Sequence, residues 1–292
     1  MDNGEGRLRW GTEQRLEFIE FRAFWEGGVR RVDITERFGV SVPQASADLS
    51  LYQRISPQNL RYNTSEKRYV PAPEFLPRFM QPNADRYLLQ LKTINDKIIK
   101  LDDTWITRPP VVDAMPVPIR RIEPAILKWF ITTIRDEKSI EILYQSMNPM
   151  RPEAVWRRIT PHAFAHDGLR WQVRAYCHIE SKFKDFILSR CRELRNDGAA
   201  GVPSSQDHQW TTFFNVILKP NPELTDSQRQ TIAMDYDMPN GEASIPVRLA
   251  LLYYFEKRLR LDVDAKKDKA AEKPVVVANW KEFVKARDAA MA

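Results

Sequence analysis

The stretch 159–194 constrains the fold of this chain most, because it predicts two paired strands that carry arginines among apolar residues. Segments 170–177 and 185–191 are rich in aromatic and branched side chains, and a polar loop separates them, which is typical of a hairpin. The triplet His-Asp-Gly at 166–168 predicts a turn before the first strand. Alternation in a strand places Trp171, Val173, Ala175 and Cys177 on one face, and Gln172, Arg174 and Tyr176 on the other.

A longer pattern runs through both strands and the turn before them. It consists of Pro161, His162, Gly168, Leu169, Arg170, Trp171, Arg174, Ala175, Tyr176, Cys177, Phe186, Leu188, Ser189 and Arg190. In these residues the stretch resembles the WYL domain, a small Sm-like β-barrel that senses ligands in bacterial regulators. The triplet that gives that domain its name is Trp-Gln-Val at 171–173 here, so the Trp alone is kept.

The composition describes a globular chain with room for two or three modest domains in its 292 residues. No apolar run approaches the roughly 20 residues of a membrane helix, and the first ten residues lack the apolar core of a signal peptide. Cys177 and Cys191 are expected to be small core residues in a reducing cytoplasm. The net charge of +6 favours an anionic partner.

The amino-terminal part predicts three helices. The first spans 12–26, with Thr12 as its cap and glycines after it, and the second spans 31–38 and ends at a glycine. The third starts at Ser41, with Pro43 in its first turn and Gln44 placed for a capping box. A helix, a tight turn and a capped helix form a helix-turn-helix.

The third helix is expected to bury Val42, Ala45, Leu49 and Tyr52 and to present small polar residues to a DNA major groove. Segments 59–62 and 67–70 around a four-residue turn predict a hairpin wing that contacts phosphates. The candidate DNA-binding residues are Ser41, Pro43, Gln44, Ser46, Ala47 and Ser50 on the helix, and Arg61, Lys67 and Arg68 on the wing. The alternative is a helical bundle with a hairpin and no role in DNA binding.

A helical linker is predicted between the wing and the strands. Its helix at 84–100 has Leu88, Leu91, Ile94, Ile98 and Leu101 at nearly coiled-coil spacing. This helix either packs within its own domain or pairs two protomers, and the sequence leaves both open. Prolines stiffen 109–118, and a second helix is expected at 123–136.

The predicted sensor carries more positive charge than the predicted DNA reader. From Ser139 to Arg195 it holds 10 basic and 6 acidic side chains, compared with 12 and 11 in the first 80 residues. Hydroxyls, an imidazole and guanidinium groups together suit an anion. The candidate ligand-binding residues, which resemblance to WYL domains supports, are Tyr144, Ser146, His162, Arg174 and Arg190. The alternative is structural: the arginines pair with carboxylates, His162 completes a turn and Tyr144 belongs to the core.

The last part of the chain predicts alternating strands and helices. A strand is expected at 212–218, a helix after Thr225, a longer helix at 247–261, a charged spacer at 265–273, and a strand and a basic helix in the tail. This order resembles the small α/β extension that follows WYL domains and pairs protomers.

No catalytic pattern is present, so we expect no enzyme activity, no cofactor and no metal. The chain has 10 glycines and lacks a phosphate-binding loop, a dinucleotide turn and a nucleophile elbow. Its four histidines and two cysteines do not have zinc-binding spacing.

Taken whole, the chain resembles WYL-domain repressors of the BrxR/CapW type, which accompany bacterial phage-defence operons. The expected fold is α+β and multidomain: a winged helix-turn-helix at 1–80, a helical linker at 81–137, a WYL barrel at 138–197 and an α/β dimerisation domain at 205–292. The resemblance implies a homodimer on an inverted-repeat DNA operator, with a nucleotide or nucleic-acid fragment as ligand. The alternatives are an activator in which the ligand promotes DNA binding, and a nucleic-acid-binding accessory protein of a defence system.

Overall fold

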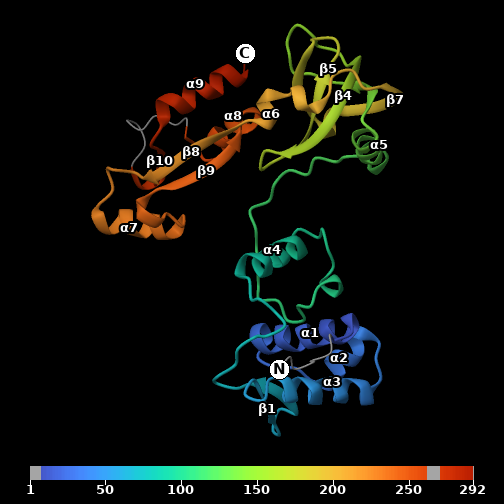
Figure 1. Cartoon of the computed structure of the whole chain (residues 1–292), viewed down its shortest axis with the longest axis vertical. Helices are drawn as coiled ribbons and strands as arrows, with labels where there is room; N and C mark the ends of the chain where they lie inside the picture. The colour runs from blue at the N-terminus through green and yellow to red at the C-terminus, as the bar shows by residue number, and fades with distance from the viewer. Residues whose placement is uncertain (1–7, 262–269, 292) are drawn as a thin grey trace, which may run out of the picture. The chain divides into compact units, whose positions relative to one another are not determined.

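The computed structural model describes residues 8–261 and 270–291, and the chain divides into two compact units, Met1–Pro116 and Val117–Ala292. Figure 1 shows a first unit of helices with one hairpin and a second unit built around two sheets. Among the described residues, no helix has the length and apolar character needed to cross a membrane.

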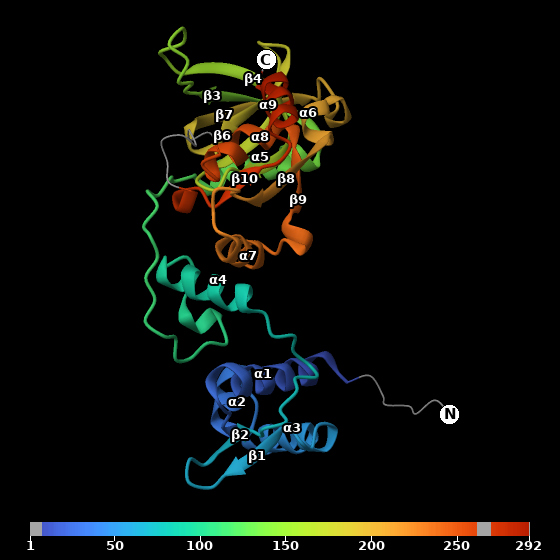
Figure 2. The ribbon, with the colours of Figure 1, turned by 90° about the vertical axis from the view of Figure 1, so that its left-hand side faces the viewer.

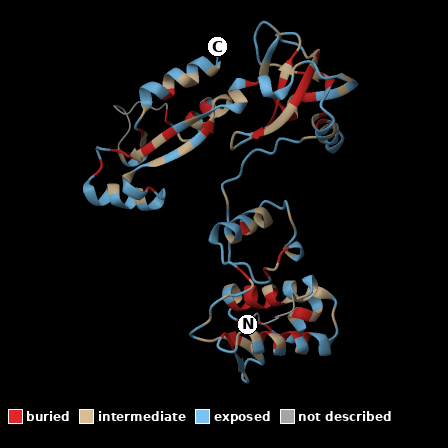
Figure 3. Ribbon diagram, in the orientation of Figure 1, coloured by how far each residue is buried: buried red, intermediate tan, exposed pale blue. Residues whose placement is uncertain are grey.

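Three helices form the core of the first unit: α1 (Trp10–Glu26), α2 (Arg31–Phe38) and α3 (Val42–Ile55). Gly27 and Gly39 end α1 and α2 in left-handed conformations, with φ of 71° and 63°, as predicted. Figure 3 shows the buried residues on the facing sides of these helices. The buried cluster consists of Leu16, Phe18, Ile19, Ala23, Val29, Ile34, Ala45, Leu49, Tyr52 and Leu60.

Two details of the helix prediction were wrong. Thr12 does not cap α1, because the helix begins two residues earlier and the Thr12 hydroxyl accepts a hydrogen bond from Arg15. Val42 is 59% exposed and not buried, because the first residue of α3 projects beyond the three-helix core.

The wing forms as predicted. Strands β1 (Leu60–Asn63) and β2 (Arg68–Pro71) pair antiparallel, and Figures 1 and 2 both show them beside α3. The Asn63 side chain accepts hydrogen bonds from two backbone N–H groups of the turn, which stabilises the turn. A bridge between Val29 and Tyr69 fastens the hairpin to the loop after α1. At this bridge Gly28 is required, because a Cβ atom there would lie 2.5 Å from the Tyr69 carbonyl oxygen.

The linker helix is shorter than predicted. Helix α4 (Ala84–Asn95) ends before a left-handed Lys97 (φ 57°), and η1 (Leu101–Asp103) follows. Leu91 is buried against Phe21 of α1, whereas Leu88 and Ile98 are exposed. The helix therefore packs within its own unit through part of the predicted stripe.

Glu20 connects α1 to the segment after the wing. Its buried carboxylate accepts hydrogen bonds from the Tyr52 hydroxyl and from the backbone N–H groups of Arg78, Phe79 and Met80, at 2.7–2.8 Å. Backbone groups that lose a buried partner are costly. Glu20 therefore connects α1 to α3, through Tyr52, and to the segment 78–80 that follows the wing.

We expect Glu20→Ala to lower the free energy of unfolding of the first unit by more than about 3 kcal/mol, because it leaves several buried donors without acceptors. Glu13→Ala, on the exposed side of the same helix, should change it by less than about 0.5 kcal/mol. Urea denaturation followed by circular dichroism measures both. Equal effects of the two substitutions would contradict this role of Glu20.

The second unit begins with α5 (Pro124–Arg135) against a five-stranded antiparallel sheet. The strands are β3 (Lys138–Tyr144), β4 (Val155–His166), β5 (Trp171–Cys177), β6 (Lys182–Ile187) and β7 (Cys191–Ala199). Their order is β6-β5-β4-β3-β7. Ile140, Ile142 and Phe130 lie in the core between the sheet and α5.

The predicted small Sm-like β-barrel is not a closed one among the described residues. Strand β7 returns to pair with β3, but among the described residues no ladder joins β7 to β6. The short helix η2 (Leu188–Arg190) turns the chain at this corner, so the two edge strands do not pair. Ser146 also lies beyond the end of β3, in the loop to β4.

A second, three-stranded sheet has the order β10-β8-β9. After η3 (Ser204–Gln206) and α6 (His208–Thr211) the chain forms β8 (Phe213–Pro220), α7 (Asp226–Asp235), η4 (Pro239–Gly241) and β9 (Ala243–Arg248). It continues with η5 (Leu249–Leu251), α8 (Leu252–Arg258), η6 (Ala270–Glu272), β10 (Val275–Val277) and α9 (Trp280–Met291). The helix predicted at 247–261 is thus shorter, because its first residues complete β9, and most of the predicted charged spacer lies outside the described residues.

Candidate DNA- and ligand-binding sites

The amino end of α3 presents the predicted reader residues. The Ser41 hydroxyl accepts a hydrogen bond from the Gln44 backbone N–H at 3.3 Å, and Pro43 lies in the first turn. Pro43, Gln44, Ala47 and Ser50 are exposed, and Ser46 is half-buried. This face therefore has the small and polar surface that entry into a groove requires.

Gln44 is held by a buried ion pair that the sequence did not reveal. Its side-chain amide turns away from the capping box and donates to Asp48 at 3.0 Å. Asp48 is buried and also accepts two hydrogen bonds from Arg15, at 2.6 and 3.2 Å. Because Arg15 fixes Asp48 and Asp48 fixes Gln44, the exposed amide has a set orientation.

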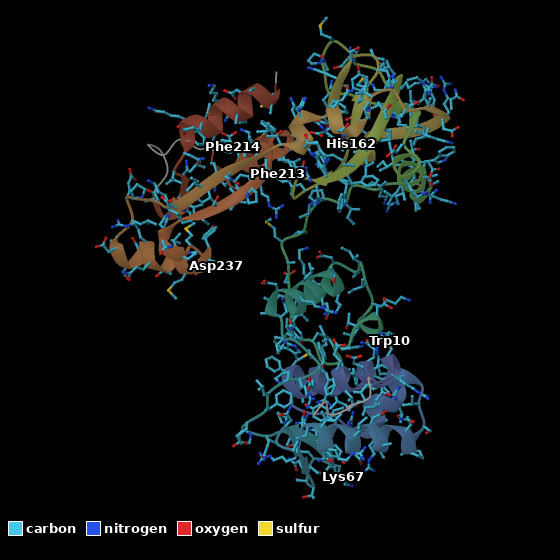
Figure 4. The ribbon with its side chains drawn as sticks, viewed as in Figure 1. Trp10, Lys67, His162, Phe213, Phe214 and Asp237 are labelled. Atoms are coloured by element: carbon cyan, nitrogen blue, oxygen red, sulfur yellow. The ribbon has the colours of Figure 1, made fainter. Side chains whose placement is uncertain are left out.

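The three basic residues of the wing differ in their surroundings. Arg61 and Lys67 are exposed, and Figure 4 shows Lys67 at the tip of the hairpin. Arg68 forms an ion pair with Glu66, with its Nε 2.6 Å from the carboxylate. Of the three, Arg61 and Lys67 are the better placed for a phosphate, because Arg68 would have to exchange a carboxylate for it.

The predicted ligand residues fall into two groups. Arg174 and His162 both bind Asp207, the residue that caps α6. Tyr144 and Arg190 lie at the corner formed by β3 and η2, where burial raises the pKa of the Tyr144 hydroxyl and the charge of Arg190 offsets part of this rise. Ser146 lies in the loop beyond this corner and accepts a hydrogen bond from the Asn148 backbone.

Arg174 forms a buried bidentate ion pair. Its Nε and Nη2 donate to the two oxygens of Asp207 at 2.7 and 3.0 Å, and the side chains are 4% and 1% exposed. Nη2 also donates to Gln209 at 2.9 Å, and Nη1 donates to Asp185 at 3.3 Å. The guanidinium therefore has its charge balanced by carboxylates of the chain itself.

His162 completes the same cluster. Its Nε2 lies 3.0 Å from Asp207 Oδ2, and its ring packs edge-on against Phe183 and Trp210. Figure 4 shows the position of His162 in the second unit. The residue lies within β4 at a bulge and not in a turn.

The pKa values of the two carboxyl groups beside Arg174 are shifted in opposite directions. Burial alone would raise the pKa of Asp207, but hydrogen bonds from His162 and Arg174 and the charge of Arg174 lower this pKa to about 2. Burial raises the pKa of Asp185, and Arg174 offsets this only in part. Asp207 is therefore the anion that Arg174 holds most firmly.

A cavity of about 740 Å³ lies where β5 and β6 meet the segment 202–209, α8 and the end of α9. Arg174 is the only predicted ligand residue among its described lining residues. Asp185, Asp207 and the Tyr254 ring also line it. Both faces of β5 are thus covered, because Val173 and Ala175 lie in the core and Arg174 lies under the carboxy-terminal part.

The predicted alternation of β5 is confirmed for Val173, Ala175 and Cys177, which share one core cluster. Trp171, at the start of the strand, is half exposed. Asp207, Gln209 and Asp185 were missed. The single local signal was an Asp ahead of a short helix, and it gave no indication of an arginine 33 positions earlier. Within residues 8–261 and 270–291, no group of three or more His, Cys, Asp or Glu side chains is placed so that it could hold a metal ion.

Three family models match successive parts of the chain. The winged helix-turn-helix domain of the BrxR transcriptional regulator matches residues 11–93, the WYL domain matches 126–196, and the BrxR carboxy-terminal dimerization domain matches 213–283. The fold and these matches define a winged-helix transcriptional regulator with a WYL domain and a dimerisation domain. The predicted domain boundaries at 80, 137 and 197 stay predictions.

Curated relatives identify the family. The DNA-binding transcriptional repressor CapW of Stenotrophomonas maltophilia is 36% identical over 96% of this chain and 93% of its own length. CapW of Escherichia coli strain KTE188 is 38% identical (89% and 87%), and CapW of Pseudomonas aeruginosa is 36% identical (94% and 90%). The chain belongs to the BrxR/CapW family of transcriptional regulators, which confirms the resemblance seen in the sequence and agrees with the prediction of a regulator and not an enzyme.

We expect Arg174→Met to lower the free energy of unfolding of the second unit by about 3–5 kcal/mol, because it leaves buried carboxylates without their cation. Adding Asp207→Asn should restore part of the loss, since the remaining amide carries no charge. Thermal denaturation of the two single variants and the double variant measures this coupling. Strictly additive effects would show that the two side chains do not depend on each other.

The low pKa of Asp207 predicts a loss of stability in acid. A carboxyl group whose pKa is depressed on folding stabilises the folded state above its unfolded pKa, and this contribution disappears as the pH falls through the folded pKa of about 2. Between about pH 5 and about pH 2.5, the melting temperature of Asp207→Asn should therefore fall less than that of the wild type. Differential scanning calorimetry across this pH range measures both melting temperatures. An equal fall in the two proteins would refute the low pKa of Asp207.

Proposed function

We propose that this chain is a homodimeric transcriptional repressor that binds an inverted-repeat operator and is controlled by an anionic ligand in its WYL domain. The observation that carries the proposal is the exposed Gln44, oriented by Asp48 and Arg15, beside a wing with two exposed basic residues. The names of the CapW relatives support repression as the direction of control. A bacterial protein with this task acts in the cytoplasm, where the chromosome is.

The proposed DNA contacts fall into two classes. Residues at the amino end of α3 read base edges, and the wing contacts phosphates without reading sequence. The proposed residues are Ser41, Pro43, Gln44, Ser46, Ala47 and Ser50 for the helix, and Arg61, Lys67 and Arg68 for the wing. In a dimer held by the carboxy-terminal domain, two copies of α3 would enter major grooves about 34 Å apart.

The proposed ligand is a nucleotide or a nucleic-acid fragment. Tyr144, Ser146 and Arg190 are its proposed contacts at one corner of the WYL sheet. His162 and Arg174 would join them only by exchanging Asp207 for the ligand, because that carboxylate holds both. A ligand that favours one dimer arrangement by about 1–3 kcal/mol would change operator affinity about 5–150-fold.

Gel shifts with the DNA upstream of the chain's own gene test the repressor. We expect Gln44→Ala combined with Ser46→Ala to abolish the specific shift, because base-edge contacts are lost. Gln81→Ala combined with Ser204→Ala removes the same side-chain types from exposed positions outside α3, the wing and the dimerisation domain, and serves as the matched control. Size-exclusion chromatography should show the same dimer for all three proteins.

Two results would count against the proposal. A reader variant that binds the operator as tightly as the control would show that α3 is not the reading helix. Binding to random duplex and single strands with equal, strongly salt-dependent affinity would indicate a nucleic-acid-binding accessory protein. A shift of the palindromic site that survives competition by random duplex supports the repressor.

A further inference from the structure

Arg157 has two buried nitrogen donors that find no acceptor among the described residues. It lies on β4 opposite Ile142, and its side chain faces the core side of the sheet, as Ile159 does. The residue is 3% exposed, and within the described part of the chain its Nε and Nη2 make no hydrogen bond. Its Nη1 has one distant acceptor, Glu180 at 3.4 Å.

The comparison with Arg174 shows what such an edge binds. Nε and Nη2 form the side of the guanidinium that takes two oxygens of one oxyanion at once. In Arg174 these two atoms hold Asp207 at 2.7 and 3.0 Å. In Arg157, one strand away, the same two atoms are buried and unpaired. Burying a charged donor without a partner is unfavourable, so this arrangement indicates a site for an acceptor.

Aromatic rings hold the Arg157 guanidinium in place. Its central carbon lies 5.6 Å from the centre of the Tyr144 ring and 5.8 Å from that of Phe186. These contacts orient the plane of the group without occupying the donors on its edge. The Tyr144 hydroxyl accepts a hydrogen bond from the Ile187 backbone and interacts with Arg190, which brings a second guanidinium to the same corner.

The local charge also favours an anion here and not at Arg174. Arg151, Arg157 and Lys184 all contact one carboxylate, Glu180. With Arg190 nearby, cations outnumber the carboxylate at this corner. At Arg174 the balance is reversed, because Asp185 and Asp207 both face the single guanidinium. A dianion such as phosphate gains more from several cations than a single carboxylate does.

We propose that the Nε–Nη2 edge of Arg157 binds a phosphate or phosphomonoester group, with Arg151, which shares the Glu180 carboxylate, and Arg190, which interacts with Tyr144, as the neighbouring cations. This site deepens the proposed function, on which it rests for the regulatory consequence of binding. It assigns the anionic part of the WYL ligand to Arg157, a residue outside the set that the sequence predicted. Arg151, which shares Glu180 with Arg157, lies in the loop 145–154 between β3 and β4, most of which is exposed.

Isothermal titration calorimetry of the full chain tests the site with three probes. These are inorganic pyrophosphate, a short single-stranded oligonucleotide with a 5′-phosphate, and the same oligonucleotide with a 5′-hydroxyl. We expect saturable binding of pyrophosphate, and tighter binding of the phosphorylated oligonucleotide than of its hydroxyl form if the group belongs to a nucleic-acid end. Equal affinity of the two oligonucleotides together with pyrophosphate binding identifies free phosphate compounds as the source.

Arg157→Met should weaken pyrophosphate binding by at least about tenfold, because the bidentate edge is removed. Arg158→Met is the matched control: it loses the same charge one residue along β4, from a side chain that bonds Ser139 and Glu141 instead. Its affinity should stay within about twofold of the wild type. Should Arg157→Met fail to fold, Arg157→Lys keeps the charge without the planar edge and should weaken binding as well.

The proposal is overturned if the wild type shows no saturable pyrophosphate binding. This result is expected if ordered water accepts the hydrogen bonds of Arg157 Nε and Nη2 instead. It is also overturned if Arg157 variants bind as well as Arg158→Met. Gel shifts of the operator separate this result from the repressor proposal, because Arg157→Met should still bind operator DNA. An operator-binding wild type without phosphate affinity would refute this site alone, and a wild type that binds pyrophosphate but no operator would refute the repressor alone.

Discussion

The ion pair between Arg174 and Asp207 joins the two halves of the second unit. Arg174 lies in the middle of β5 of the WYL sheet, and Asp207 caps α6, from which the chain runs directly into β8 of the dimerisation domain. Both side chains are buried, so neither is stabilised by water if the other is removed. Tyr254 of α8 adds a hydrogen bond to Asp185 beside the pair. The sheet face that carries Arg174 is therefore an internal contact surface and not a free one.

Because of this contact, Arg174 cannot be assigned to ligand binding only because it is an arginine in a predicted sensor. A guanidinium with two carboxylates against it offers no net attraction to another anion, and a ligand at Arg174 has to compete with a bidentate partner that is always present. Because Asp207 also caps α6 through the Trp210 N–H, displacing it disturbs the start of the dimerisation domain. Arg174 thus links the sheet to the part of the chain that pairs protomers, whatever else it binds.

Local patterns in the sequence predicted the elements well, and long-range contacts set the limits. Glycine turns and the Ser41 cap act within a few residues, so the helix-turn-helix and the wing were found with small errors, such as Val42 at the exposed start of α3. The stripe through 84–100 could not show that the chain turns at Lys97. The partners of Gln44, Arg174 and Glu20 are distant or lie outside any local motif, and their chemistry depends on the folded arrangement.

Arg157 and Arg174 show why residue type alone does not identify a binding residue. Both are buried arginines on neighbouring strands of one sheet, and in the sequence each stands among the apolar residues of its strand. The difference lies in what the fold brings to the guanidinium: a carboxylate from residue 207 on the Nε–Nη2 edge of Arg174, and two aromatic rings near the Cζ of Arg157, whose Nε and Nη2 find no acceptor within the described part of the chain. The positive excess of residues 139–195 is consequently not spread evenly. It is neutralised where the sheet meets the dimerisation domain and persists at the corner between β3, β4 and η2, so attraction for an anion and the rigid link to the dimer lie at separate places on one sheet.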